Sequence, residues 1–429
     1  MADIARLHAA FLTTTGVCTD TRKLRKGAMF FALKGPNFNA NAFAAQALEA
    51  GCAFAVVDDP VVAANDRFFL VSDTLRALQD LARHHRRTFN IPVLAITGTN
   101  GKTTTKELIH AVMAADRSTL ATEGNLNNHI GVPLTLLRLG AGHHMAIIEM
   151  GASKPGDIAE LCAIAEPTHG LITNIGKAHL EGFGGLDGVV RTKTELYDHL
   201  RSCKGIAFVH GDDPLLMAKS AGLKRVTYGL GADRDTCGGP DDDATLYLHV
   251  HFADRQRRGR HYLETQLVGA YNVPNVLAAV CAGQHFRVPD PVIAEAIRAY
   301  APGNNRSQFT DTGRNHLVLD AYNANPSSMA AALENFAAMP SERPKLAILG
   351  DMLELGAGSA QEHQAIVSLV DRLELDALYV GREFGKATDK AVASVTELGE
   401  LMAAGPVTGK LILLKGSNGI KLGTIVPHL

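Results

Sequence analysis

Short apolar runs alternate along the chain with longer stretches in which apolar residues recur at helical spacing. Residues 93–96 form such a run, and beyond Lys102 the apolar residues Leu108, Ile109 and Val112 recur every three to four positions. A short apolar run bounded by turn residues indicates a buried strand, whereas the longer period indicates a helix. This stretch therefore predicts a strand, a glycine-containing turn and a helix in succession.

The same alternation continues through the chain and predicts an α/β protein whose sheets are mainly parallel. Strands are expected at residues 28–33, 54–57, 93–97, 145–149, 170–173, 206–209, 240–252, 262–268, 317–320, 345–349, 377–380 and 410–414. Helices are expected at residues 43–50, 72–87, 328–338 and 359–373, and another begins within 269–282. The charged stretch 253–261 is interpreted as an exposed turn.

The order of these elements divides the chain into three units. We expect a small α/β unit at residues 1–88, a larger one at 89–303 and a third at 304–429. The first unit ends in the basic run Arg83-His-His-Arg-Arg87, which could bind phosphate but is better interpreted as a solvated helix end. A length of 429 residues agrees with about three domains.

Composition excludes several classes of function. Hydrophobic residues make up 46 % of the chain and charged residues 20 %, and 42 Lys and Arg against 44 Asp and Glu leave a net charge of −2. This balance is globular and gives no basic footprint for nucleic acid or an anionic membrane. Six scattered cysteines, no signal-peptide pattern and no long uncharged apolar run predict a protein of the reducing cytoplasm without a membrane span.

The turn after the strand at 93–97 has the chemistry of a phosphate site. It reads Thr97-Gly-Thr-Asn-Gly-Lys102-Thr-Thr, and it opens the helix. Free backbone N–H groups at a helix N-terminus bind anions, Lys102 adds a positive charge and the Thr103 hydroxyl suits Mg²⁺. Ile96 replaces the first glycine of the common phosphate loop, so an ordinary turn is the alternative interpretation.

Polar residues follow several other predicted strands at their carboxyl ends, where open α/β sheets bind ligands. Glu149 ends one strand and is placed to hold Mg²⁺, although a capping glutamate is the alternative. His179 follows another strand, and Lys193 and Glu195 lie on a predicted helix beyond it. Asparagine-rich or polar turns follow at residues 124–129, 322–326, 350–354 and 415–418, and each alone could be ordinary turn chemistry.

These motifs together resemble the Mur ligase family, and within it the members that add D-alanyl-D-alanine. The matching stretches are residues 19–22, 30–35, 97–105, 124–133, 149–151, 174–179, 320–326, 350–356 and 415–418, in the family's order and over nearly the whole chain. Asn323-Ala-Asn-Pro-Ser and Gly350-Asp-Met-Leu-Glu-Leu-Gly are the most diagnostic. The Asp-Asn-Pro-Arg tetrapeptide of the members that add the third amino acid is absent.

The resemblance implies a uridine-binding N-terminal domain, a central phosphate-loop ATPase domain and a Rossmann-like C-terminal domain. It implies that ATP phosphorylates the carboxylate of UDP-N-acetylmuramoyl-tripeptide and that the amine of D-alanyl-D-alanine attacks the acyl phosphate, giving an amide, ADP and phosphate. A monomer is expected, and closure of the C-terminal domain over the site would exclude water.

The family also implies roles for individual residues. Those implied for ATP are Gly98, Thr99, Asn100, Gly101, Lys102, Thr103, Thr104, Asn275, Arg306 and Asp320. Those implied for the peptide and uridine substrates are Asp20, Thr21, Arg22, Asn125, Asn127, Asn323, Asn325, Lys415 and Ser417. Two Mg²⁺ ions are implied, held by Thr103, Glu149 and His179, with Lys193 matching a lysine that can be carbamylated.

The chain departs from the family at three places, which leave local contacts open. Thr194 follows Lys193 where a glycine is usual, Tyr271 stands where histidine is frequent, and Asn39-Ala-Asn41 replaces Asp-Gly-His in the uridine-binding loop. The sequence therefore leaves open whether Lys193 is modified.

Two other readings compete with this one. The first is another ligase, either the one that adds the third amino acid or a folylpolyglutamate-type enzyme. The second is a phosphate-loop regulator without ligase activity. The absence of Asn-Lys-x-Asp disfavours a GTPase switch, and the presence of Lys102, Glu149 and His179 disfavours an inactive ligase.

Overall fold

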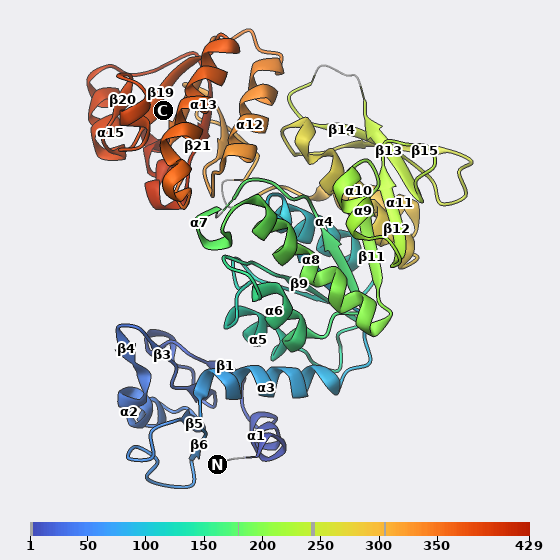
Figure 1. Ribbon diagram of the computed structural model, residues 1–429, viewed down its shortest axis with the longest axis vertical. Coiled ribbons are helices and arrows are strands. Elements are labelled where there is room, and N and C mark those ends of the chain that lie inside the picture. Colours follow the sequence, from blue (N-terminus) through green and yellow to red (C-terminus); the bar gives the residue numbers. More distant parts are fainter. Residues whose placement is uncertain (1–2, 179, 242–244, 304–305) are drawn as a thin grey trace.

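The computed structural model describes residues 3–178, 180–241, 245–303 and 306–429. Three α/β units follow one another along the molecule, with the N-terminal and C-terminal units at opposite ends of the central one (Figure 1). The predicted fold class is confirmed: the larger sheets are mainly parallel. Among the described residues, no helix is both long and apolar enough to cross a membrane.

The N-terminal unit contains, within its described residues, a four-stranded parallel sheet in the order β1-β2-β5-β6. Its strands are β1 (Val17–Cys18), β2 (Met29–Phe31), β5 (Phe54–Val57) and β6 (Phe68–Leu70), with a small hairpin of β3 (Lys34–Gly35) and β4 (Phe38–Asn39). Its helices are α1 (Ile4–Phe11), α2 (Ala44–Glu49) and α3 (Thr74–Arg87). Asp73 caps α3 by accepting a hydrogen bond from Arg76 N.

The basic end of α3 is only partly solvated, with Arg87 exposed. His85 and Arg86 are buried, and Arg86 donates to the carbonyl oxygens of Ala165 and Glu166 in the central unit. Arg87 forms an ion pair with the carboxylate of Glu166. The prediction of a solvated helix end was wrong for His85 and Arg86, because periodicity does not reveal that α3 packs between α1 and the central helices α5 and α6.

The central unit carries, in its described part, a nine-stranded sheet in the order β15-β14-β13-β12-β11-β10-β7-β9-β8. Its strands are β7 (Val93–Thr97), β8 (Thr119–Ala121), β9 (Met145–Glu149), β10 (His169–Ile172), β11 (Ile206–His210), β12 (Lys224–Gly229), β13 (Thr236–Pro240), β14 (His249–Ala253) and β15 (Arg260–Glu264). Its helices are α4 (Lys102–Ala114), α5 (Gly131–Leu136), α6 (Asp157–Ala165), α7 (Leu180–Phe183), α8 (Leu186–Cys203), α9 (Pro214–Lys219), α10 (Val273–His285) and α11 (Asp290–Ala299).

Both faces of this sheet are covered, which explains why its strands read as continuous apolar runs. In β7, Val93 and Ala95 join one hydrophobic cluster, whereas Leu94 and Ile96 join the other together with residues of α4 and α10. Successive side chains of one strand therefore pack into two different hydrophobic cores, one on each face of the sheet.

The strand predicted at 240–252 is wrong, because this region contributes to two strands. β13 ends at Pro240, β14 begins at His249, and the two pair antiparallel. Gly238 and Gly239 provide no apolar side chains to β13, so the hydrophobic pattern does not mark it. The exposed turn predicted at 253–261 is confirmed as the connection between the antiparallel strands β14 and β15.

The C-terminal unit has, over its described residues, a six-stranded sheet in the order β16-β17-β21-β18-β19-β20. Its strands are β16 (Gln308–Asp311), β17 (His316–Asp320), β18 (Lys345–Gly350), β19 (Asp376–Val380), β20 (Ala391–Val392) and β21 (Leu411–Lys415). Its helices are α12 (Pro326–Ala338), α13 (Ser359–Arg372), α14 (Phe384–Ala387) and α15 (Val395–Ala404). Every pairing is parallel except that of β16 with β17.

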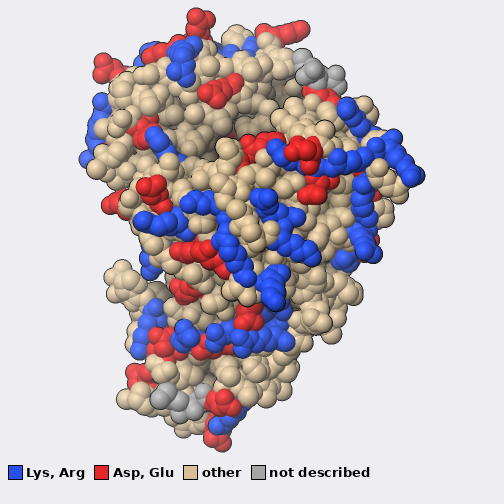
Figure 2. Space-filling view, turned by 45° about the vertical axis from the view of Figure 1, so that its right-hand side comes forward, with Lys and Arg blue, Asp and Glu red and all other residues tan. Residues whose placement is uncertain are grey.

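The surface carries acidic and basic side chains interspersed over the face shown in Figure 2, as the near-zero net charge leads one to expect.

Candidate active site

A cavity of about 780 Å³ lies between the central and C-terminal units. The central unit contributes the turn after β7, the ends of β9 and β10, and parts of α6, α8 and α10 to its wall. The C-terminal unit contributes the ends of β17 and β21 and the start of α12. Among the residues predicted from the sequence, the cavity is lined by Gly98, Thr99, Asn100, Gly101, Lys102, Thr103, Thr104, Asn125, Asn127, Glu149, Lys193, Asn275, Arg306, Asp320, Asn323, Asn325 and Lys415.

The turn between β7 and α4 has the geometry of a phosphate loop. Gly98 and Gly101 have φ angles of 143° and 78°, which other residues rarely adopt. A Cβ atom at Gly98 would lie 2.0 Å from Thr173 Oγ1, and one at Gly101 would lie 2.7 Å from Asn275 Oδ1. Both glycines are thus required for the loop to pass close to its neighbours, and Ile96 in place of the first common glycine does not prevent this.

Lys102 bends back over the loop that precedes it. Its Nζ donates to the carbonyl oxygens of Gly98, at 2.7 Å, and Thr99, at 2.9 Å. Burial lowers the pKa of Lys102 to about 8, with Glu149 opposing this effect and the positive Arg306 adding to it. A cation held at the mouth of a helix N-terminus is arranged to bind an anionic phosphate group.

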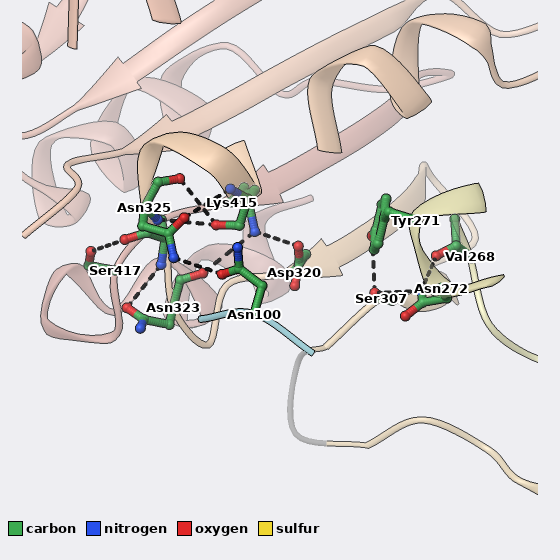
Figure 3. Close-up of polar contacts among 12 residues, drawn as sticks. Asn100, Val268, Tyr271, Asn272, Ser307, Asp320, Asn323, Asn325, Lys415 and Ser417 are labelled. Carbon is green, nitrogen blue, oxygen red and sulfur yellow. Dashed lines mark hydrogen bonds and ion pairs between the residues drawn. The ribbon is translucent and has the colours of Figure 1, made fainter. Parts of the chain in front are cut away.

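Asparagine side chains hold the loop on both sides. Asn174 accepts from the backbone N–H of Asn100 and donates to its carbonyl oxygen, each at 3.0 Å. Asn325 of the C-terminal unit donates from Nδ2 to the side-chain oxygen of Asn100 at 2.7 Å (Figure 3). Sequence reasoning included Asn174 in the matching stretch 174–179 but assigned it no role, although its place just beyond the end of β10 was a signal that could have identified it.

Glu149 is a buried carboxylate with one oxygen left for a ligand. Its Oε1 accepts from Asn127 Nδ2 at 2.8 Å, while its Oε2 is buried without a hydrogen-bond partner among the described residues. Thr103 lines the same cavity and is only 4 % exposed. An orphaned carboxylate oxygen and a hydroxyl that line one cavity are donors of the kind that suits Mg²⁺. Across the described ranges no three His, Cys, Asp or Glu side chains gather as a metal cluster.

Lys193 projects from α8 into the same cavity and is 3 % exposed. Burial and, to a smaller extent, the positive Lys102 lower the pKa of Lys193 to about 7 against the opposing effect of Asp157 and Glu195. Glu195 itself accepts hydrogen bonds from the backbone N–H groups of Gly156 and Ala159 at the start of α6. Lys193 is therefore a lysine with a large neutral fraction near pH 7.

The C-terminal wall is a second cluster of polar groups (Figure 3). Lys415, at the end of β21, donates to Asp320 Oδ2 at 2.5 Å, and the two residues are paired in register across β17 and β21. Ser417 accepts from the backbone N–H of Leu353 and lines a smaller adjoining cavity of about 220 Å³ with Asn323 and Asn325.

Comparison with known proteins agrees with this geometry. Models of the Mur ligase middle domain and of the Mur ligase glutamate ligase domain match residues 96–283 and 305–418. A curated UDP-N-acetylmuramoyl-tripeptide–D-alanyl-D-alanine ligase of Bacillus subtilis is 35 % identical, with 96 % of this chain and 93 % of the relative aligned. The Escherichia coli ligase of the same description is 34 % identical over 99 % and 95 % of the two chains.

The chain belongs to the Mur ligase family, among its UDP-N-acetylmuramoyl-tripeptide–D-alanyl-D-alanine ligases. The fold agrees over full length: MurF from Acinetobacter baumannii superposes with a TM-score of 0.88 at 30 % identity, covering 99 % of this chain and 97 % of that one. MurF from Thermotoga maritima in complex with ADP gives 0.86 at 26 %, covering 100 % and 98 %.

Some predicted residues of this Mur ligase lie away from the main cavity. Asp20 accepts hydrogen bonds from the backbone and guanidinium of Arg22, which lowers the pKa of Asp20 to about 2, and with Thr21 they form a turn of the N-terminal domain. In the loop that departs from the family, Asn41 is buried and donates to Asp58. His179 lies outside the described residues.

Other residues of the Mur ligase line the cavity although sequence reasoning did not select them. They include Asn128, His129, Ser153, Lys154, Asp157, Glu160, Asn174, Phe183, Asn272, Ser307, Tyr322, Ser327 and Ser328, together with Tyr271, which the sequence marked only as a departure from the family. Most are turn residues or lie at helix ends, and no spacing in the sequence distinguishes them from ordinary turns.

Proposed function

We propose that this chain joins D-alanyl-D-alanine to UDP-N-acetylmuramoyl-tripeptide at the expense of ATP, forming the pentapeptide precursor of peptidoglycan. The observation that carries this proposal is a cavity lined on one side by a phosphate loop and on the other by the polar wall of the C-terminal domain. Ligases of this description are the full-length relatives of the chain.

The residues suit a reaction in two steps. In the first, the tripeptide carboxylate attacks the γ-phosphorus of ATP, ADP leaves and an acyl phosphate forms. In the second, the dipeptide amine attacks the acyl carbon, and phosphate leaves as the amide forms and the amine loses a proton. Lys102 and the backbone N–H groups of residues 98–104 would stabilise the charge on the transferred phosphoryl group.

The remaining assignments are those that the family resemblance implies. Asn275, Arg306 and Asp320 would contact ATP, and Asn125 and Asn127 the muramoyl-peptide. Asn323, Asn325, Lys415 and Ser417 would form the wall of the reaction site on the C-terminal side. Asp20, Thr21 and Arg22 would bind the uridine end from the N-terminal domain. The proposed domains are residues 1–88, 89–303 and 304–429.

Thr103 and Glu149 would hold one Mg²⁺ ion, as the unpartnered Oε2 of Glu149 supports. A bound Mg²⁺ would neutralise charge that develops during phosphoryl transfer. His179 and a carbamylated Lys193 would serve a second ion. The lowered pKa of Lys193 supports carbamylation, because only a neutral amine adds CO₂, with loss of one proton.

We further propose that the chain works as a monomer in the cytoplasm and that its C-terminal domain rotates inward when nucleotide and substrate bind. Closure would exclude water from the acyl phosphate. Small-angle scattering should show a smaller radius of gyration with an ATP analogue and UDP-muramoyl-tripeptide than without them. Superimposable scattering curves would refute closure.

The deciding experiment measures phosphate release from ATP and Mg²⁺ with UDP-muramoyl-tripeptide, with and without D-alanyl-D-alanine. Release that requires both, with the pentapeptide seen by mass spectrometry, is expected. Release with the dipeptide precursor and a single diamino acid would instead indicate the ligase that adds the third residue. No release with any pair of substrates would refute ligase activity.

A further inference from the structure

We propose that Tyr271 is a positioning residue: it fixes Ser307 in the interdomain linker and thereby holds Arg306 in the nucleotide site. This inference rests on the proposed function for the identity of the nucleotide. It goes further by assigning a role to Tyr271, where the chain departs from its family.

The first observation is the conformation of Ser307. Its φ of +46° lies in the left-handed region, which is unfavourable for a residue other than glycine, and its side chain is 5 % exposed. Such a conformation persists only when surrounding contacts hold it. Ser307 stands directly before β16, the first strand of the C-terminal domain.

The second observation identifies these contacts. The Tyr271 hydroxyl is 3.0 Å from Ser307 Oγ, and Asn272 Nδ2 donates to the same oxygen at 3.3 Å and to Val268 O at 2.9 Å (Figure 3). Both residues belong to the short helix η3 (Ala270–Asn272) of the central domain. The backbone N–H of Ala270 also donates to Asn335 of α12 at 3.0 Å, so η3 contacts the C-terminal domain at two places.

The third observation concerns the neighbour of Ser307. Arg306 lines the main cavity, and its guanidinium carbon lies 3.6 Å from the centre of the Tyr322 ring. Its Nε is buried without a hydrogen-bond partner among the described residues. An unpartnered buried donor on a cation facing the phosphate loop is arranged for an anionic ligand. Arg306 directly precedes Ser307 in the chain. The contact of Ser307 with Tyr271 therefore fixes the backbone position from which the Arg306 side chain extends.

The same segment also reaches the phosphate loop. Asn275 Nδ2 donates to Asn272 Oδ1 at 2.8 Å, and Asn275 Oδ1 accepts from Thr105 of α4 at 3.0 Å. A chain of hydrogen bonds thus runs from the loop helix to the linker. These hydrogen bonds therefore hold the segments that carry the two cations of the site, Lys102 and Arg306, in a fixed position relative to each other.

The test is ADP binding by calorimetry to the full-length chain, which requires no ligation. Tyr271→Phe removes only the hydroxyl and should weaken ADP binding about tenfold, the size expected for loss of one buried hydrogen bond and its positioning effect. Tyr300→Phe is the matched control: Tyr300 donates to Glu107 at 2.7 Å near the same linker but outside the cavity. Its ADP affinity should equal that of the unaltered chain.

A double-mutant cycle distinguishes positioning from general support. If Tyr271 acts through Arg306, adding Tyr271→Phe to the Arg306→Ala variant should weaken ADP binding by less than a further twofold. Ser307→Gly, which keeps the left-handed backbone and removes the hydroxyl, should match Tyr271→Phe. The inference would be overturned if the loss of ADP affinity in the double variant equalled the product of the losses in the two single variants, or if Tyr271→Phe left ADP affinity unchanged. Absence of ligation by the unaltered chain would instead overturn the proposed function.

Discussion

Replacing Lys193 with methionine should make the protein more stable near neutral pH. Methionine has a similar length and no charge, so it can occupy the same buried position on α8. The lysine ammonium is costly there because burial and the positive Lys102 lower its pKa from 10.5 to about 7. The side chain that we propose to serve the reaction is thus expected to destabilise the fold.

The size and pH dependence of the effect follow from proton linkage. Between pH 7 and 10.5 the unfolded chain binds more protons at this lysine than the folded chain, so stability rises with pH. The cost is fully present below pH 7, amounts to about 4 kcal/mol at pH 7 and disappears above pH 10.5. Lys193→Met should therefore raise the unfolding temperature of the central domain by about 10 °C at pH 7.

The assay is thermal unfolding of the two proteins from pH 6.5 to 10 in buffer free of CO₂, with each domain's transition resolved. Lys154→Met is the control, because Lys154 lines the same cavity but is exposed, and it should shift the transition by less than 1 °C. Bicarbonate should stabilise the unaltered chain and not the variant if Lys193 adds CO₂. A Lys193→Met protein that is less stable at pH 7, or a difference that does not shrink with pH, would refute the reasoning.

Three further substitutions test other parts of the site. Glu149→Gln, which keeps the contact with Asn127 possible but removes the charge, should lower kcat about a hundredfold and raise the Mg²⁺ concentration needed for half-maximal rate; an unchanged Mg²⁺ titration would exclude it as a ligand. Asn325→Ala removes both the cap of α12 and the contact with Asn100, so it should lower the free energy of unfolding of the C-terminal domain by about 2 kcal/mol. Urea unfolding measures this change, and a smaller loss would contradict a stabilising role of the two contacts. Asp20→Asn should raise KM for the UDP-substrate about tenfold at constant KM for ATP, and equal changes in both would contradict a uridine role.

The elements that the sequence predicted best are those buried on both faces or capped by a clear signal. β7 and β9 were predicted with their observed bounds because apolar runs of five residues or fewer, ended by polar turns, have few other structural interpretations. β13 was missed because its residues Thr-Cys-Gly-Gly-Pro carry almost no hydrophobic pattern. The hydrophobic pattern of a segment does not predict a strand that is defined by hydrogen bonding to neighbouring strands rather than by burial of its side chains.

The site was predictable to the extent that its residues sit at strand ends. Glu149 and Asp320 were found because each closes a strand, where open sheets bind ligands. The contact between Asn325 and Asn100 joins residues far apart in the chain and depends on how two domains dock, which no local spacing specifies. The same holds for Ser307, whose left-handed backbone is not marked by a glycine.

The interdomain contacts fall into two groups that suggest how the cavity opens. On one side, single side chains bridge the domains: Asn325 to Asn100, and Lys177 to Glu362 at 2.6 Å. On the other side, η3 holds the linker at Ser307 and α12 at Asn335 through several hydrogen bonds. The ion pair of Lys177 is largely exposed and Asn325 makes a single part-buried hydrogen bond to Asn100, so each is cheaper to break than the set of contacts that holds the strained Ser307. Rotation of the C-terminal domain would therefore separate Asn325 from Asn100 and pivot near Ser307, so that Arg306 stays beside the phosphate loop while the reaction wall around Lys415 moves.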